Sequence, residues 1–168
     1  MLDKNEYNPY YERYISKVDT HADVVDMFQK GKVMVVQFFK KISQEKSNYR
    51  YAAHKWSVKE VLQHIIDTER IFIYRCFRIG REDKTPMEGF DQDQYMLPSG
   101  ASDKTIDELI NEYVALRESS ISLLSSLTQD NLRNIGCANS DMISARACAF
   151  IILGHEICHL DVISERYL

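Results

Sequence analysis

SVKEVLQHIIDTERIFIYRCFRIG, at residues 57–80, is the stretch that decides the fold of this chain. Ser57 is followed three residues later by Glu60, a pairing that forms the capping box at the start of many helices. Apolar residues then recur at the spacing of one helix face, and Gly80 is typical of the place where a helix ends. We therefore predict one long helix from Ser57 to about Ile79.

Three other segments repeat this helical spacing of apolar residues, at residues 19–43, 103–127 and 143–167. Glycine and proline are scarce, with six and three in 168 residues, which favours helices over a β-rich fold. The pattern predicts an all-α fold, a four-helix bundle that forms one domain over residues 1–168.

Two connections interrupt the helical pattern. Residues 81–103 contain Pro86 and Pro98 and are too long for a tight hairpin, so the second and third helices are free to run parallel. Residues 131–141 are expected to form a loop before the last helix. A connection as long as residues 81–103 is often functional in a compact domain.

The composition excludes several classes of protein. A formal net charge of −4 gives no basic surface for nucleic acid. No uninterrupted apolar run is long enough to span a membrane, and the polar start at residues 1–6 is unlike a signal peptide. The four cysteines have no metal-binding spacing and are expected to be reduced thiols. We predict a cytoplasmic protein with neither nucleic-acid nor membrane partners.

Two histidines lie four positions apart in the last predicted helix, within Gly154-His155-Glu156-Ile157-Cys158-His159. Residues at i and i+4 share a helix face, so His155 and His159 can bind one metal ion. The string also matches the H-E-x-x-H of zinc proteases, but Val162 and Glu165 stand where the extended motif has Gly and His. A third ligand must therefore come from upstream in the chain.

The position of each remaining histidine on its helix indicates which one can be the third metal ligand. His155 and His159 share a face that is mostly small or apolar and is expected to point inward. His64 lies between the apolar face of its helix and a more polar one, where it suits an open metal site or an ordinary half-buried histidine. His21 and His54 are expected to be exposed to solvent. Spacing alone leaves open whether the three inward histidines bind metal or only bond to neighbouring groups.

Several segments together resemble the DinB/YfiT-like family. Residues 51–70 contain a tryptophan, a small capping residue and a histidine eight positions after the tryptophan, here Trp56, Ser57 and His64. The resemblance continues through Tyr74–Arg78, Gly89–Asp93, Gly154–Leu160 and Glu165–Leu168, and covers roughly residues 15–168.

The resemblance implies an up-down-down-up bundle, with the long crossover between its second and third helices, and often a homodimer. It also implies a divalent metal ion held by His64, His155 and His159. Imidazole ligands suit zinc or nickel, with iron as a further candidate. Many relatives have a second histidine where this chain has Cys158, whose thiol could bind a soft metal or simply pack.

A metal ion held by three histidines keeps one coordination position open for water or substrate. The wider family is similar to thiol S-transferases, which join a low-molecular-weight thiol to an electrophile, and to small-molecule hydrolases. We therefore expect a metal-dependent enzyme of one of these types with a small-molecule substrate. The alternatives are a non-catalytic metal- or ligand-binding module of a stress response and, as the third reading, a zinc protease.

Polar residues beside the histidines are candidates for orienting them or lining a pocket. Glu60, Asp67 and Thr68 share the face of His64, whereas Glu156 lies about 100° round the helix from His155 and is expected to point away. The stretch Asp67-Thr68-Glu69-Arg70 reads as a solvated, ion-paired segment. The long connection offers a substrate mouth or a simple cover for the bundle end, through Phe90, Asp91, Asp93 and Tyr95.

Overall fold

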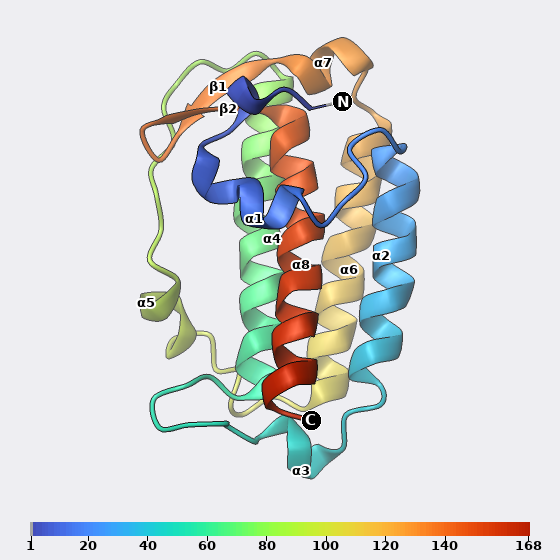
Figure 1. The fold of residues 1–168 in the computed structure, drawn as a ribbon, viewed down its shortest axis with the longest axis vertical. Helices are drawn as coiled ribbons and strands as arrows, with labels where there is room; N and C mark the ends of the chain where they lie inside the picture. The colour runs from blue at the N-terminus through green and yellow to red at the C-terminus, as the bar shows by residue number, and fades with distance from the viewer. Residues whose placement is uncertain (1) are drawn as a thin grey trace.

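The structure is a computed structural model that describes residues 2–168. Four long helices lie side by side and make the body of the molecule (Figure 1). They are α2 (Val24–Phe39), α4 (Val58–Gly80), α6 (Ile106–Ser125) and α8 (Ala145–Arg166). The all-α, four-helix-bundle prediction is confirmed.

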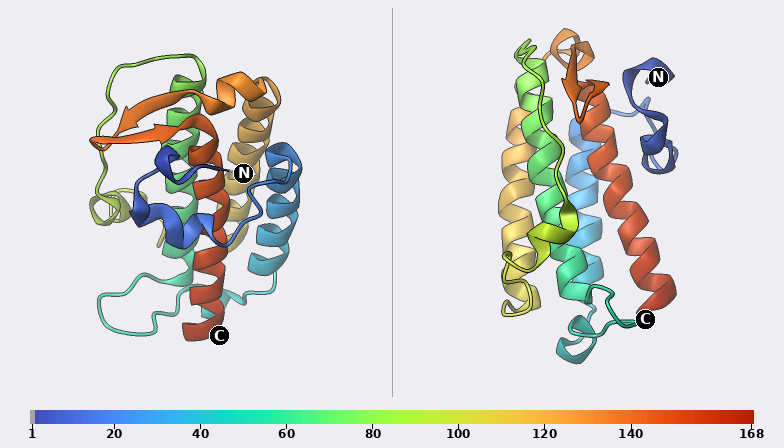
Figure 2. Two further views of the ribbon diagram at one scale, coloured as in Figure 1. Left: turned by 45° about the horizontal axis from the view of Figure 1, so that its top comes forward. Right: turned by 90° about the vertical axis from the view of Figure 1, so that its left-hand side faces the viewer.

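The two middle helices of the bundle run parallel. In Figure 1, α2 and α8 descend while α4 and α6 rise, which is the up-down-down-up order. The connection after α4 makes this possible, because it returns along the whole length of the bundle and includes the short helix α5 (Gln92–Met96) (Figure 2). The predicted crossover between the second and third long helices is confirmed.

Capping side chains decide where the long helices begin. Ser57 accepts a hydrogen bond from the backbone N–H of Glu60, and the Glu60 side chain accepts one from Ser57, as predicted. The first long helix starts after Asp23 and not near residue 19, because the Asp23 carboxylate accepts the Asp26 N–H. Thr105 caps α6 in the same way.

A β-hairpin occupies most of the segment expected to be a loop before the last helix. Strands β1 (Ile135–Ala138) and β2 (Asp141–Ser144) pair antiparallel, with Ala138 opposite Asp141. Asn139 and Ser140 make the turn, both with positive φ, as a two-residue hairpin turn of type I′ requires. The loop prediction was wrong here, although the fold class is unaffected.

Short helical turns complete the chain outside the four long helices. One group precedes α2 and lies against α8 and the hairpin (Figure 2). The turns are η1 (Lys4–Glu6), η2 (Pro9–Tyr11), α1 (Glu12–Ile15), α3 (Gln44–Ser47) and α7 (Gln129–Arg133).

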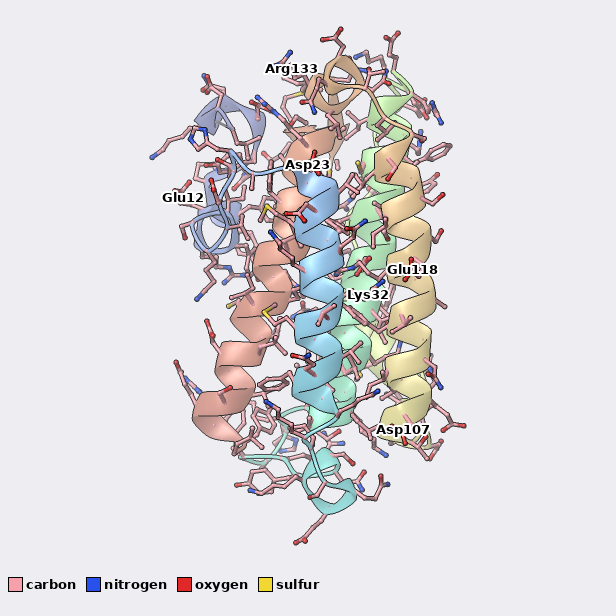
Figure 3. All side chains as sticks on the ribbon, turned by 90° about the vertical axis from the view of Figure 1, so that its right-hand side faces the viewer. Glu12, Asp23, Lys32, Asp107, Glu118 and Arg133 are labelled. Carbon is pink, nitrogen blue, oxygen red and sulfur yellow. The ribbon has the colours of Figure 1, made fainter. Side chains whose placement is uncertain are left out.

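Helix α8 is the central helix of the hydrophobic core. By length and composition it could cross a membrane, but 67% of its most apolar window is buried inside the bundle. Residues 147–155 of α8 are buried without interruption. On another side of the bundle, Lys32 of α2 pairs with Glu118 of α6 (Figure 3). The apolar character of α8 is therefore that of a core helix in this bundle.

Candidate metal centre

Three histidines from two helices meet inside the bundle. The Nε2 atom of His64 on α4 lies 2.9 Å from Nε2 of His155 on α8, and Nε2 of His159 lies 3.1 Å from the same atom. The ligand atoms of all three lie within 4.8 Å of one another. The i, i+4 spacing on α8 supplies two of the rings, and α4, packed against α8, supplies the third.

Burial keeps these imidazoles in the neutral form. It lowers the pKa of His64 to about 3 and that of His159 to about 4, with the charge of His159 adding to the effect on His64 and that of Arg13 to the effect on His159. Burial also lowers the pKa of His155 well below its usual range. Neutral imidazole is the form that binds a metal ion.

The three ring nitrogens are close enough together to share one divalent ion. Neutral imidazoles at these distances can also share N–H···N hydrogen bonds, with the donor set by the tautomer, whereas a cation among them would accept all three unshared electron pairs. Two ligands of a tetrahedral zinc ion at about 2.05 Å stand about 3.3 Å apart. The observed 2.9 and 3.1 Å separations are within a few tenths of an ångström of that value.

Aromatic rings support the histidines from outside. Trp56 lies against His64 with 4.8 Å between ring centroids, and Tyr14 makes an edge contact with His155 at 5.2 Å. Tyr14 belongs to α1, so the N-terminal segment helps to hold the cluster. Within residues 2–168, no carboxylate forms a hydrogen bond with any of the three imidazoles.

The other predicted site residues lie at different places in the structure, and not all of them are beside the histidines. Thr68 lies beside His64 and His155 at the cavity described below. Glu60 instead caps α4 and pairs with Arg50, and Asp67 bonds to Gln63 and Arg70, so neither carboxylate orients an imidazole. Cys158 packs, partly buried, against the hydrophobic core and stands outside the cluster of possible ligand atoms in the described chain. His21 and His54 are exposed, as predicted.

A cavity of about 570 Å³ opens onto His64 and His155. Residues of α4 and α8 line it, together with the N-terminal segment, the connection around residues 89–93, and Asn139 and Asp141 of the hairpin. Phe90, Asp91 and Asp93 line it, in agreement with the substrate-mouth hypothesis, whereas Tyr95 faces a different depression. Three N-terminal tyrosines also line it: Tyr10, Tyr11 and Tyr14.

A buried charge network behind the histidines was missed by the sequence analysis. Arg117 of α6, fully buried, donates to Glu69 of α4 at 2.7 Å and to Glu156 of α8 at 2.5 Å. Tyr113 donates to Glu156 at 3.1 Å. Glu69 is therefore not part of a solvated stretch, although Asp67 and Arg70 do pair as expected. The sequence did contain a signal for this network. Each of the three helices has one charged residue on its apolar stripe, and the positive residue on α6 is opposite in sign to those on α4 and α8.

Comparisons with known proteins agree with this architecture. The sequence profile of the DinB superfamily matches residues 27–163. The fold is similar to YfiT from Bacillus subtilis, described as a probable metal-dependent hydrolase with an unusual four-helix bundle topology, with a TM-score of 0.74 and 14% identity over 98% of this chain and 90% of that one. It is also similar to YjoA, a DinB-like protein from Bacillus subtilis, with a TM-score of 0.59 and 20% identity over 84% of this chain and 89% of that one. No curated protein matches the chain.

Proposed function

The chain belongs to the DinB superfamily, and on this premise we propose that it is a metal-dependent enzyme that acts on a small molecule. His64, His155 and His159 are the metal ligands in this proposal. The observation that carries it is the convergence of three neutral imidazoles, two of which, His64 and His155, line a cavity. A structural histidine cluster has no need of such an opening.

The size of the cavity supports a small-molecule substrate. About 570 Å³ falls within the range of ordinary ligand pockets, which is roughly 300–1,000 Å³. Aromatic rings and a few polar groups line it, and this mixture is typical of pockets that orient a ligand.

A divalent ion at this site would supply an open coordination position and lower the pKa of a water or thiol bound there. The protein's own residues would keep the ligands neutral, orient them and limit the access of water. Burial keeps the three imidazoles neutral, and Tyr14 and Trp56 hold the His155 and His64 rings. The walls of the cavity limit the access of bulk water to the reacting atoms.

Two reactions use such a site in the same way. Hydrolysis is placed first, because the fold neighbour YfiT is described as a probable metal-dependent hydrolase. Transfer of a low-molecular-weight thiol to an electrophile is the second, since a thiol can occupy the same open position as water. A non-catalytic metal-binding module is the competing function, and it predicts an occupied site without turnover.

The zinc-protease interpretation is opposed by the position of Glu156. In those enzymes the glutamate of H-E-x-x-H is the general base beside the metal. Here Glu156 is buried in contact with Arg117 and Tyr113 and does not line the cavity. The third histidine also comes from upstream and not from a downstream extension of the motif.

The test of this function is turnover by the metal-loaded protein. Purified protein loaded separately with zinc, nickel and iron is assayed for hydrolysis of small esters and amides, and for displacement of chloride from 1-chloro-2,4-dinitrobenzene by the thiol of cysteine. We expect turnover that disappears on chelation and in His64→Ala, and that persists in His21→Ala, an exposed control. A stoichiometrically loaded protein without turnover in either assay would favour the binding module.

Three further predictions accompany this proposal and await measurement. They are the identity of the metal as zinc, nickel or iron, a homodimeric assembly, and a cytoplasmic location. The first is read from metal analysis, the second from the mass of the particle in solution, and the third from cell fractionation.

A further inference from the structure

Arg75 of α4 is a buried cation without an anionic partner. Its exposed fraction is 3%, and its Nη2 atom donates to the backbone carbonyl of Glu88 at 2.9 Å. Its guanidinium lies over the ring of Phe72, 5.0 Å from the centroid. Within residues 2–168, no carboxylate lies at ion-pair distance from Arg75.

An arrangement of this kind is unfavourable unless something compensates the charge. Removing a guanidinium from water costs several kcal/mol in general, and buried arginines are therefore normally paired with carboxylates. Arg117, the other deeply buried arginine, follows that rule with two glutamates. A guanidinium has five N–H donors, and the Glu88 carbonyl and the Tyr11 hydroxyl leave most of those of Arg75 free.

The free N–H donors of Arg75 can bind a ligand in the cavity. Arg75 lines the same cavity as His64 and His155. It lies three helical turns after His64 on the same face of α4, about 16 Å along the helix axis. The cavity therefore extends along α4 from the histidines to Arg75.

A second buried polar group, Thr68, lies on α4 between His64 and Arg75. Thr68 is 3% exposed, and its Oγ1 atom is the one buried side-chain polar atom without a hydrogen-bond partner in the described part of the chain. It also lines the cavity. Buried polar atoms are nearly always bonded, so this hydroxyl indicates a polar group that arrives from outside.

The acidic residues around the cavity are already engaged or lie at its rim. Asp91 caps α5 by accepting the backbone N–H groups of Asp93 and Gln94. Asp141 accepts a hydrogen bond from Asn8, and the Asp93 side chain is exposed. Arg75 is therefore the charged group that an entering ligand meets at the buried end of the cavity, away from the histidines.

We propose that Arg75 binds an oxyanion group, carboxylate or phosphate, of the small molecule that the cavity takes. The inference rests on the proposed function only in placing the reacting end of that molecule at the histidines. It narrows the substrate class to small anionic molecules whose anionic group and reacting atom lie at opposite ends. Aromatic side chains on the walls, Tyr11 and Phe90, contact the part between the two ends.

The test compares two probes of the same shape, 3-phenylpropionate and its neutral amide, 3-phenylpropanamide. Binding to the full-length, isotope-labelled protein is followed by NMR titration, with metal bound and after chelation. We expect the acid to bind about tenfold more tightly than the amide in both states, because a charged hydrogen bond replaces a neutral one. Phenyl phosphate, titrated in parallel, shows whether phosphate or carboxylate is preferred.

Variants assign the preference to Arg75. Arg75→Gln can still donate to the Glu88 carbonyl but has no charge, and we expect it to bind acid and amide equally. Arg81→Gln, at an exposed position beyond the end of α4, is the matched control and retains the tenfold preference. If Arg75→Gln does not fold, Arg75→Lys serves instead, and there the preference should weaken without disappearing.

Equal binding of acid and amide by the wild type would overturn the proposal, as would a preference that survives in Arg75→Gln. Either result would leave Arg75 as a tether for the connection at Glu88. A preference that vanishes on chelation would also overturn it, because the carboxylate would then be bound at the histidines. A preference that remains in a protein without any metal affinity would support Arg75 while rejecting the metalloenzyme.

Discussion

Glu156 lies 2.5 Å from Arg117 Nη2 and does not line the cavity, although it follows His155 directly in the sequence. Neighbouring residues on a helix point about 100° apart, so one can serve the metal centre and the other the core. Arg117 thus joins α4, α6 and α8 directly behind the histidines, through Glu69 and Glu156.

Replacing Arg117 by methionine is expected to destabilise the protein strongly. Two buried carboxylates, those of Glu69 and Glu156, would lose their shared counterion, and breaking a buried pair in this way costs about 3–5 kcal/mol. Urea denaturation of Arg117→Met measures the loss. Arg133→Met, an exposed control, should change the free energy of unfolding by no more than ~0.5 kcal/mol.

Glu156→Gln should cost less stability than Arg117→Met. The substitution leaves one carboxylate, Glu69, facing one guanidinium, so the buried charges then balance. The variant should also retain the metal content of the wild type, because Glu156 makes no contact with the histidines. A Glu156→Gln variant with normal metal content but no turnover would instead support the protease-like role for this residue.

Gly154 allows the N-terminal segment to lie against α8. A Cβ atom at this position would stand 2.0 Å from the backbone carbonyl oxygen of Tyr14. Gly154→Ala should therefore lift α1 away from α8, expose the segment before α2 and remove Tyr14 from His155. Limited proteolysis should cut this segment faster than in the wild type.

The matched control for that experiment is Ser164→Ala, at an exposed position on the same helix. It should be cut at the wild-type rate. If Gly154→Ala is also cut at that rate, and is as stable as the wild type, the close contact between the two segments does not exist in solution.

The pair formed by Glu6 and Arg146 should make stability depend on pH in the acid range. Burial raises the pKa of Glu6, but hydrogen bonds from Arg146 and from the Asp3 backbone lower it by more, so the net value is below 4.5. A folded-state pKa below the unfolded one gives stability that is present above pH 4.5 and is lost as the pH falls through the folded value.

Glu6→Gln isolates this contribution. The difference in free energy of unfolding between the wild type and Glu6→Gln should be constant above about pH 5 and shrink steadily on acidification. Denaturation curves at a series of pH values measure it. A difference that grows toward low pH would contradict the assignment.

The elements of the fold were predictable because their signals are local. The capping box at Ser57 and the apolar spacing within each helix depend on residues three or four positions apart, and α4 begins after Ser57 as predicted. The hairpin was missed because its turn, Asn139–Ser140, has no glycine to mark the two positive φ values.

The candidate site was only partly accessible from the sequence. The i, i+4 spacing of His155 and His159 placed them on one face, but the convergence of His64 on them depends on the rotation of α4 against α8, which spacing does not give. The same reason hid Arg117 and its two glutamates, which come together only when three helices pack.

Metal content of purified, tag-free protein is the measurement that tests the central claim most directly. Wild type, His155→Ala and the exposed control His21→Ala are saturated with zinc or nickel, dialysed and analysed for bound metal. We predict about one ion per chain in the wild type and in His21→Ala, and loss of the ion in folded His155→Ala. No retained metal in the wild type, or equal retention in His155→Ala, would contradict the three-histidine site.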